Sequence, residues 1–254
     1  MIYLPEPSLI FYIQVLFYLS FGIIVFYLES TGKFNLPYSK FASSEGISPR
    51  IGMFIIYFIP ILGYASTVPN WKLQSSYQII LLLIFTFHFA KRCLEVLFLH
   101  QFSGKIGIIG VIVITLAYTN IGLLLGSNHA KMIYPEIISF LDPMLMLGML
   151  LFSIGQIGNF YHHLILKKLR STQQSNEYTI PKGALFDKVI CPHYFFELVS
   201  WLGIAVLSHH WESYVIFFLM TCYLFGRSTR TLSWYHSKFK DFPTDKKRII
   251  PYIY

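Results

Sequence analysis

Three polar side chains share one stripe of a largely apolar segment. Asn159, His163 and Arg170 are separated by four and then seven residues, so a helix would place them on a single face. Such a stripe presents an amide, an imidazole and a guanidinium to one ligand. The alternative is a helix end that extends its basic groups towards lipid headgroups, and the spacing leaves both interpretations open.

A second group surrounds a carboxylate in the segment CPHYFFELVSW, residues 191–201. His193 and Glu197 are four residues apart, as are Glu197 and Trp201, so a helix would align all three. A carboxylate inside an apolar span indicates a functional site or a buried pair with a base. His193 and Glu197 resemble two metal ligands, but HExxH is absent and no third ligand is obvious. We therefore predict no metal site.

The C-terminal tail forms a third group, which is basic. Arg227, Arg230 and the run Lys246–Arg248 follow the last apolar stretch. One interpretation is attraction to anionic lipid, worth about 1 kcal/mol per basic residue. The other is a phosphate-binding site, and isolated charges do not decide between them.

These groups belong to a chain with the composition of a membrane protein. Of its 254 residues, 55% are hydrophobic and 13% are charged, and the mean hydropathy is +0.55; soluble domains carry about 25% charged residues. We predict an all-α polytopic membrane protein of about seven transmembrane helices, forming one membrane domain over residues 1–254. The candidate spans are Leu9–Leu28, Ile51–Thr67, Tyr77–Ala90, Ile106–Leu125, Ile138–Asn159, Tyr194–Leu207 and Tyr214–Phe225.

The basic residues give the orientation. All of the 20 Lys and Arg residues except Lys72 and Lys131 fall in segments that follow the first, third, fifth and seventh spans. The positive-inside rule then predicts a cytosolic C-terminus. Because topology explains the net charge of +8, that charge does not indicate a nucleic-acid partner. Soluble nucleotide-binding motifs such as GxGxxG and GxxxxGK[ST] are also absent.

The C-terminal part resembles the steroid 5α-reductase family, which includes very-long-chain enoyl-CoA reductases and polyprenol reductases. The resemblance rests on IPKGALF, on CPHYFFE with Trp201, on the segment from Arg227 to the WY pair, and on the closing IIPYIY. It covers residues 150–254 well and extends more weakly to HFAKRCLEVLFLHQFSG, where it looks most like a plant-type branch. It implies that residues 150–254 bind NADPH and that the divergent residues 1–149 shape the substrate pocket.

The resemblance also implies individual roles. Trp201 matches a tryptophan beside the nicotinamide, and Lys246 replaces an arginine of the family. His163 and His193 stand where many members have Asp and Asn. The remaining matches to residues that look like cofactor contacts are Asn159, Arg170, Tyr178, Glu197, Arg227 and Tyr235.

The substrate side departs from the animal steroid enzymes. Tyr57 and Phe89 stand nearest to the Glu and Tyr that hold the steroid ketone in those enzymes, and we expect Phe89 and Arg92 to contact substrate. Tyr194 matches the tyrosine that enoyl-CoA reductases use as proton donor. Our candidates for the catalytic phenol are therefore Tyr194 first and Tyr57 second.

The resemblance thus predicts an enzyme of the endoplasmic reticulum that uses NADPH to reduce a carbon–carbon double bond conjugated to a carbonyl in a lipid, such as a steroid-like enone. Alternatives are a very-long-chain trans-2-enoyl-CoA reductase, a polyprenol reductase, or a non-catalytic lipid-binding scaffold. The expected partners are the lipid substrate and the membrane. The sequence does not indicate an oligomeric state.

Overall fold

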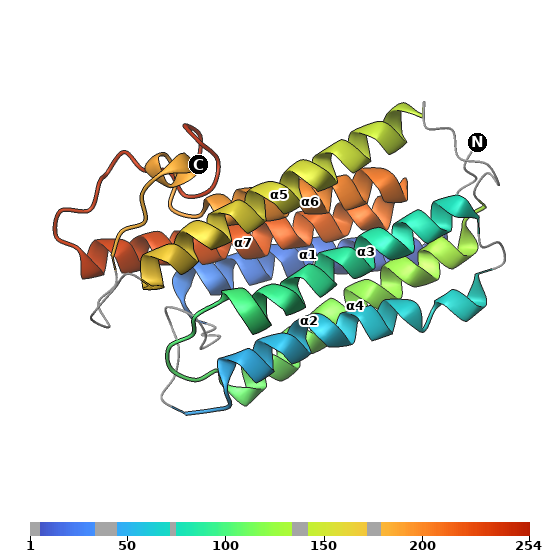
Figure 1. Cartoon of the computed structure of the whole chain (residues 1–254). Helices are drawn as coiled ribbons and strands as arrows, with labels where there is room; N and C mark the ends of the chain where they lie inside the picture. The colour runs from blue at the N-terminus through green and yellow to red at the C-terminus, as the bar shows by residue number, and fades with distance from the viewer. Residues whose placement is uncertain (1–5, 34–44, 72–74, 134–141, 172–178) are drawn as a thin grey trace. The chain divides into compact units, whose positions relative to one another are not determined.

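The structure, a computed structural model, describes residues 6–33, 45–71, 75–133, 142–171 and 179–254. Within these residues it is all-α, with two isolated β-bridges and no strand. Figure 1 shows the order of the helices. The α-helices are α1 (Leu9–Thr31), α2 (Pro49–Ala65), α3 (Ser76–Leu94), α4 (Ile108–Lys131), α5 (Pro143–Ser171), α6 (Pro192–Ser208) and α7 (Trp211–Lys238).

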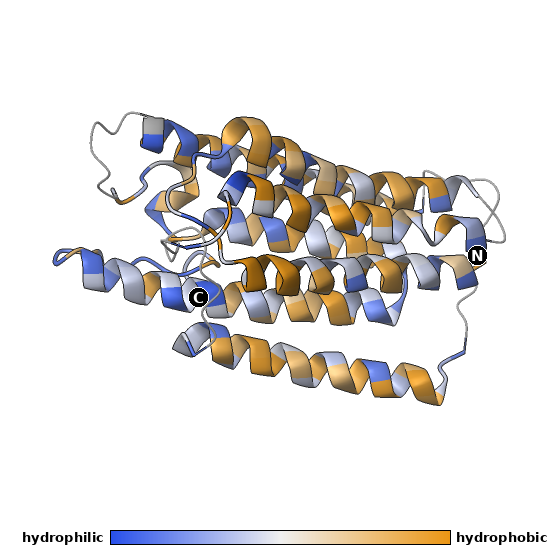
Figure 2. Ribbon diagram, turned by 90° about the horizontal axis from the view of Figure 1, so that it is seen from below, coloured by the Kyte–Doolittle hydropathy of each residue, from blue (hydrophilic) through white to orange (hydrophobic). Residues whose placement is uncertain are grey.

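Among the described residues, four segments are long and apolar enough to cross a membrane by length and composition. They are α1, α4, α5 and Pro49–Asn70, which joins α2 to the short helix η2 (Val68–Asn70). Large apolar side chains remain exposed along these helices, as a lipid-facing surface requires. Figure 2 shows the apolar residues running along the helices. The predicted all-α polytopic membrane fold is confirmed. A helix occupies most of each predicted span within the described residues, although α2 ends at Ala65, before the predicted Thr67, and α4 begins at Ile108, after the predicted Ile106.

Two helices continue well beyond the apolar stretches that predicted them. α5 extends past Asn159 to Ser171, and α7 extends past Phe225 to Lys238. Hydropathy falls in these extensions, but Leu, Lys and Arg remain good helix formers. Basic side chains in the last turns also favour the negative end of the helix dipole. The extensions therefore place predicted site residues on helices.

The chain divides into two compact units, which are described separately. One unit contains α2, α3, α4 and the turn from α6 to α7, and the other contains α1, α5, most of α6, and α7. Their bounds are Met1–Tyr12, Leu36–Gly148 and Ile204–Tyr214 for the first, and Ile13–Asn35, Met149–Gly203 and Val215–Tyr254 for the second.

In the first unit, α2 packs against both α3 and α4. Gly122 allows the close approach of α4, because a Cβ there would lie 2.8 Å from the carbonyl oxygen of Pro60. The buried ring of Tyr64 stacks on Phe85 at 4.4 Å, and its hydroxyl lies 2.6 Å from His129 Nδ1. A capping box of Ser75 and Gln78 fixes the start of α3.

In the second unit, glycines set the spacing between helices α1 and α7. A Cβ at Gly226 of α7 would lie 2.9 Å from the Phe26 carbonyl oxygen and 2.9 Å from Glu29 Cβ, both on α1. The C-terminal segment returns onto this unit: Tyr254 stacks on Phe225 of α7 at 4.3 Å. Cys191 N donates to the Arg248 carbonyl, so the start of α6 is tied to the tail.

Candidate active site

Close packing of α5 on α6 creates the central feature of the second unit. A Cβ at Gly155 would lie 2.7 Å from the Phe196 carbonyl oxygen, and a Cβ at Gly158 would enter the Phe196 ring. A larger residue at either position could not be accommodated without moving the two helices apart. The two glycines therefore bring the face of α5 that carries Asn159 directly against α6.

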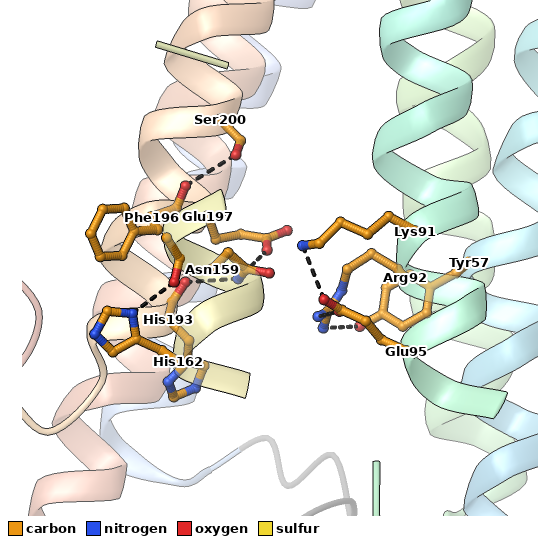
Figure 3. A network of polar contacts seen from close by, with 11 residues as sticks. Tyr57, Lys91, Arg92, Glu95, Asn159, His162, His193, Phe196, Glu197 and Ser200 are labelled. Atoms are coloured by element: carbon orange, nitrogen blue, oxygen red, sulfur yellow. Dashed lines mark hydrogen bonds and ion pairs between the residues drawn. The ribbon is translucent and has the colours of Figure 1, made fainter. Parts of the chain in front are cut away.

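Asn159 is buried and joins the two helices through its amide group. Its Nδ2 donates to the His193 carbonyl oxygen at 2.9 Å and to Glu197 Oε2 at 3.0 Å. Figure 3 shows the amide directed at Glu197. Two acceptors for one amide nitrogen fix its orientation. Asn159 and Glu197, which the sequence places on separate stripes, thus form one polar pair.

The histidines pack around this pair. His162 Nδ1 lies 2.7 Å from the Gly158 carbonyl oxygen, and its ring stacks on Phe196 with the centroids 5.2 Å apart. The rings of His163 and His193 are 5.5 Å apart, and His193 in turn lies 4.4 Å from the Tyr194 ring. The predicted residues His163, His193 and Tyr194 therefore form a continuous series of rings beside Asn159.

Trp201 of α6 and the predicted residues of α7 are buried. Trp201, one turn after Glu197 on α6, is 1% exposed. Tyr235 packs its ring against Phe242 at 5.0 Å near the end of α7. Arg227 is 1% exposed, and its Nη1 donates to Glu29 Oε2 of α1 at 3.3 Å.

The remaining predicted cofactor residues lie at the ends of elements. Arg170 is half-buried in the last turn of α5, and Tyr178 lies outside the described residues. Lys246 Nζ donates to the Phe186 carbonyl oxygen at 2.8 Å, which ties the tail to the IPKGALF segment. Burial lowers the pKa of Lys246 because it disfavours the charged ammonium, although Asp187 and Asp245 oppose this.

A separate polar cluster lies in the first unit. Arg92 of α3 donates from Nη2 to the Tyr57 hydroxyl at 3.0 Å, and its guanidinium lies over the Tyr57 ring at 4.9 Å. Phe89 is 1% exposed and packs against Phe85 at 4.8 Å. Arg92 and Tyr57, predicted independently of one another, are therefore in direct contact, while Phe89 belongs to the aromatic core of this unit.

Sequence reasoning missed two acidic residues. The first is buried Glu95, which forms two ion pairs (Figure 3). Its Oε1 lies 3.1 Å from Lys91 Nζ, and its Oε2 lies 2.6 Å from Arg92 Nη1. The spacings of three and four residues were a readable signal for these ion pairs. Glu29 was missed because the predicted first span ended one residue before it, and its partner Arg227 is remote in sequence.

Comparison with known proteins places the chain in a family. The sequence profile described as 3-oxo-5-alpha-steroid 4-dehydrogenase matches residues 107–254. The chain belongs to this family. Human 3-oxo-5-alpha-steroid 4-dehydrogenase 1 is 30% identical over 198 residues, which cover 77% of this chain and 75% of the human protein. The predicted resemblance to the steroid 5α-reductases is confirmed.

Two further relatives show how the similarity is distributed. Steroid 5-alpha-reductase DET2 of Gossypium hirsutum is 42% identical, but over only 109 residues, or 42% of each chain. Very-long-chain enoyl-CoA reductase of Dictyostelium discoideum is 29% identical over 207 residues, which cover 78% of this chain and 64% of that protein. Membership of this family makes the chain an oxidoreductase that acts on CH–CH groups, within a family that also contains enoyl-CoA reductases.

Proposed function

We propose that this protein is an NADPH-dependent reductase of a carbon–carbon double bond conjugated to a carbonyl in a membrane lipid. The observation that carries the proposal is the hydrogen-bonded pair of buried Asn159 and half-buried Glu197 on helices α5 and α6. Both residues match positions that resemble the cofactor contacts of the family. A carboxylate and an amide within apolar helices are costly, and such pairs often mark functional sites.

The chemistry of this pair suits a nicotinamide. A carboxamide group carries N–H donors, and the Glu197 carboxylate is an acceptor that Asn159 already orients. The Trp201 indole, four residues on, provides an aromatic surface of the kind that borders a planar ring. When bound, the reduced nicotinamide supplies hydride to the β-carbon of the substrate.

Phosphate groups require cations, and the same unit provides them. Arg227 and Arg230 lie three residues apart on α7, and Arg170 ends α5. A guanidinium binds phosphate with two parallel hydrogen bonds, which a single point charge does not. Lys246 contributes mainly by holding the tail on the IPKGALF segment through its bond to Phe186.

The reaction also needs a hydrogen-bond donor to the substrate's carbonyl oxygen and a source of the proton that is added to the α-carbon. We propose Tyr194 as this donor, with Tyr57 as the second candidate. The ring of Tyr194 packs on His193, whose carbonyl oxygen holds Asn159. In favour of Tyr57, its oxygen accepts a hydrogen bond from Arg92. Such a bond stabilises negative charge on the phenol and strengthens its own donation.

A very-long-chain enoyl-CoA is the alternative substrate. It is favoured by the Dictyostelium relative, whose similarity to this chain extends over 207 residues. Reduction of a thioester enone needs the same hydride acceptor and carbonyl donor as reduction of a steroid-like enone. A polyprenol is a third substrate class, and the outcome of a substrate panel distinguishes all three.

We further propose that the protein resides in the endoplasmic reticulum with its C-terminus in the cytosol. The support is the charge asymmetry of the loops, which leaves only Lys72 and Lys131 on the opposite side. Arg170, Arg227 and Lys246 then face the compartment that supplies a phosphorylated cofactor.

The test is NADPH oxidation by the purified protein with steroid enones, enoyl-CoAs and polyprenols. We expect oxidation with one class and loss of that activity in Asn159→Ala. Binding of NADPH without turnover of any substrate would contradict the assigned reaction. Failure both to bind and to oxidise NADPH would instead favour a non-catalytic lipid-binding scaffold.

The catalytic phenol is tested by two matched substitutions. We expect Tyr194→Phe to lower kcat by about a hundredfold, since general acids contribute roughly 10²–10⁴-fold, while the Kd for NADPH stays unchanged. Tyr57→Phe serves as the comparison. A larger loss in Tyr57→Phe would transfer the role to the Tyr57–Arg92 pair, and normal turnover in both variants would exclude a phenolic donor.

A further inference from the structure

Glu29 is an unusual residue in helix α1. This helix is exposed along most of its length, and its only buried residues are Gly22 and Glu29. The Glu29 side chain is 2% exposed. An ionised carboxylate is costly to bury in an apolar helix, so its burial needs a specific explanation.

Part of the explanation is the contact with α7. Glu29 Oε2 accepts a hydrogen bond from Arg227 Nη1 at 3.3 Å. Arg230, one turn further along α7, acts on Glu29 as a second positive charge. Gly226 permits this approach, because any Cβ there would lie 2.9 Å from Glu29 Cβ.

The end of α1 is shaped for the same contact. Gly32 terminates the helix with a φ of +70°, a conformation that glycine adopts without strain. A Cβ at Gly32 would lie 3.6 Å from Arg230 Nε, so the guanidinium runs alongside the turn. Two guanidinium groups and one carboxylate therefore converge where α1 ends, and together they retain a net positive charge.

The ion pair satisfies only one of the two carboxylate oxygens. Glu29 Oε1 is buried and has no hydrogen-bond partner among the described residues. A carboxylate oxygen accepts hydrogen bonds and does not donate them, so it needs an N–H or O–H group. Leaving such an atom unpaired costs about 1–3 kcal/mol.

A phosphorylated ribose carries both the hydroxyl donor that Glu29 Oε1 lacks and an anionic group that suits guanidinium side chains. Its phosphate is an acceptor for guanidinium groups, and its hydroxyls are donors for a carboxylate. Acidic side chains in other nucleotide-binding folds accept hydrogen bonds from ribose hydroxyls for the same reason. Phosphate without a ribose would attract the guanidinium groups but would be repelled by Glu29 and would offer it no hydroxyl donor.

We propose that Glu29 is part of the cofactor site, where Oε2 holds Arg227 towards a phosphate of the nucleotide and Oε1 accepts a hydrogen bond from a ribose hydroxyl. This inference rests on the proposed nicotinamide cofactor. It adds a residue of the first helix to a site otherwise built from α5, α6 and α7.

The first experiment measures NADPH binding by the purified full-length protein in detergent. We expect Glu29→Gln and Glu29→Ala to raise the Kd for NADPH about tenfold, the effect of losing a hydrogen bond worth about 1.4 kcal/mol. They should also reduce the increase in Tm that NADPH produces. Glu212→Gln is the matched control, because Glu212 is another buried acid, which lies on α7 and contacts His210. The Kd of this variant for NADPH should not change.

Two results would overturn the inference. An unchanged Kd with a lowered Tm in the absence of cofactor would make Glu29 a purely structural link between α1 and α7. A lowered Kd would mean that the carboxylate competes with the phosphate for Arg227. If the wild-type protein itself binds no NADPH, the proposed function fails, whereas normal wild-type binding with unaffected variants removes only the role of Glu29.

A double-mutant cycle distinguishes a direct contact between Glu29 and the nucleotide from an indirect effect of Glu29 on the position of Arg227. In an Arg227→Lys background, Glu29→Gln should still raise the Kd if Oε1 touches the nucleotide. No additional rise in that background would overturn the ribose contact.

Discussion

The two units hold their acidic side chains in different ways. In the first unit, Glu95 pairs with Lys91 and Arg92, which lie within one turn of it. In the second, Glu197 pairs with Asn159 from another helix, and Glu29 pairs with Arg227, which lies 198 residues away. The ion pairs of Glu95 can form as soon as the end of α3 folds. The contacts of Glu197 and Glu29 form only after helices that are distant in sequence pack together. We infer that the second unit is preorganised for a fixed ligand and that the first can vary with the substrate.

The largest effect is expected from a substitution that forces α5 away from α6, because the contacts of the second unit depend on this packing. In Gly155→Val, the added Cβ would meet the backbone of α6, including the Phe196 carbonyl oxygen at 2.7 Å. Overpacking of this kind costs about 1–3 kcal/mol or more, and here rigid backbone atoms leave no room to relax. We expect a clear fall in Tm and loss of NADPH binding, measured by thermal unfolding in detergent.

A matched glycine on α1 is the control. A Cβ at Gly22 would meet only side-chain atoms, the nearest being Phe218 Cε1 at 3.1 Å, so Gly22→Ala should change Tm much less. Equal effects of the two substitutions would contradict the special role of the contact between α5 and α6.

A smaller change targets the polar pair and leaves the helix packing intact. Asn159→Asp places a carboxylate within hydrogen-bond distance of the Glu197 carboxylate and the His193 carbonyl oxygen. Like charges at this separation cost several kcal/mol, so NADPH affinity should fall by about a hundredfold or more. Isothermal titration calorimetry at neutral pH tests this; affinity within a few-fold of the wild type would show that the pair does not contribute to the cofactor site.

The smallest expected effect concerns the local cluster of the first unit. Glu95→Gln removes the charge that Lys91 and Arg92 share, but keeps a side chain of the same size. We expect NADPH affinity to stay unchanged and kcat to fall only a few-fold, because Arg92 retains its bond to the Tyr57 hydroxyl. Steady-state kinetics with separate KM and kcat values check this. A large rise in the Kd for NADPH would contradict the separation of tasks between the units.

Local patterns were sufficient to predict that several candidate residues share a helix. The spacing of Asn159, His163 and Arg170 predicted one helical face, and α5 includes all three. The same holds for His193, Glu197 and Trp201 on α6. The i,i+4 rule acts within a single helix, which is why such groups can be read from spacing alone.

Partners on different helices could not be read in this way. No sequence pattern links Asn159 to Glu197. Their contact depends on how α5 packs against α6, and Phe196 of α6 lies against Gly155 and Gly158, where a Cβ would clash. Glu29 was excluded from the first predicted span by its charge, although helix α1 includes it and buries it. A hydropathy pattern reflects the free-energy cost of burying a charged side chain. It does not show the ion-pair partner that offsets this cost.

The sequence by itself determined that this is an all-α membrane protein, that its basic residues gather after alternate apolar stretches, and that its family is that of the 3-oxo-5-alpha-steroid 4-dehydrogenases. Composition and helical periodicity are properties of contiguous segments, so they need no knowledge of packing. Only the tertiary structure decided that Glu29 reaches Arg227 and that Asn159 is fixed by Glu197. These contacts depend on the close approach of helices at single glycines, which is a property of two surfaces together and of neither sequence alone.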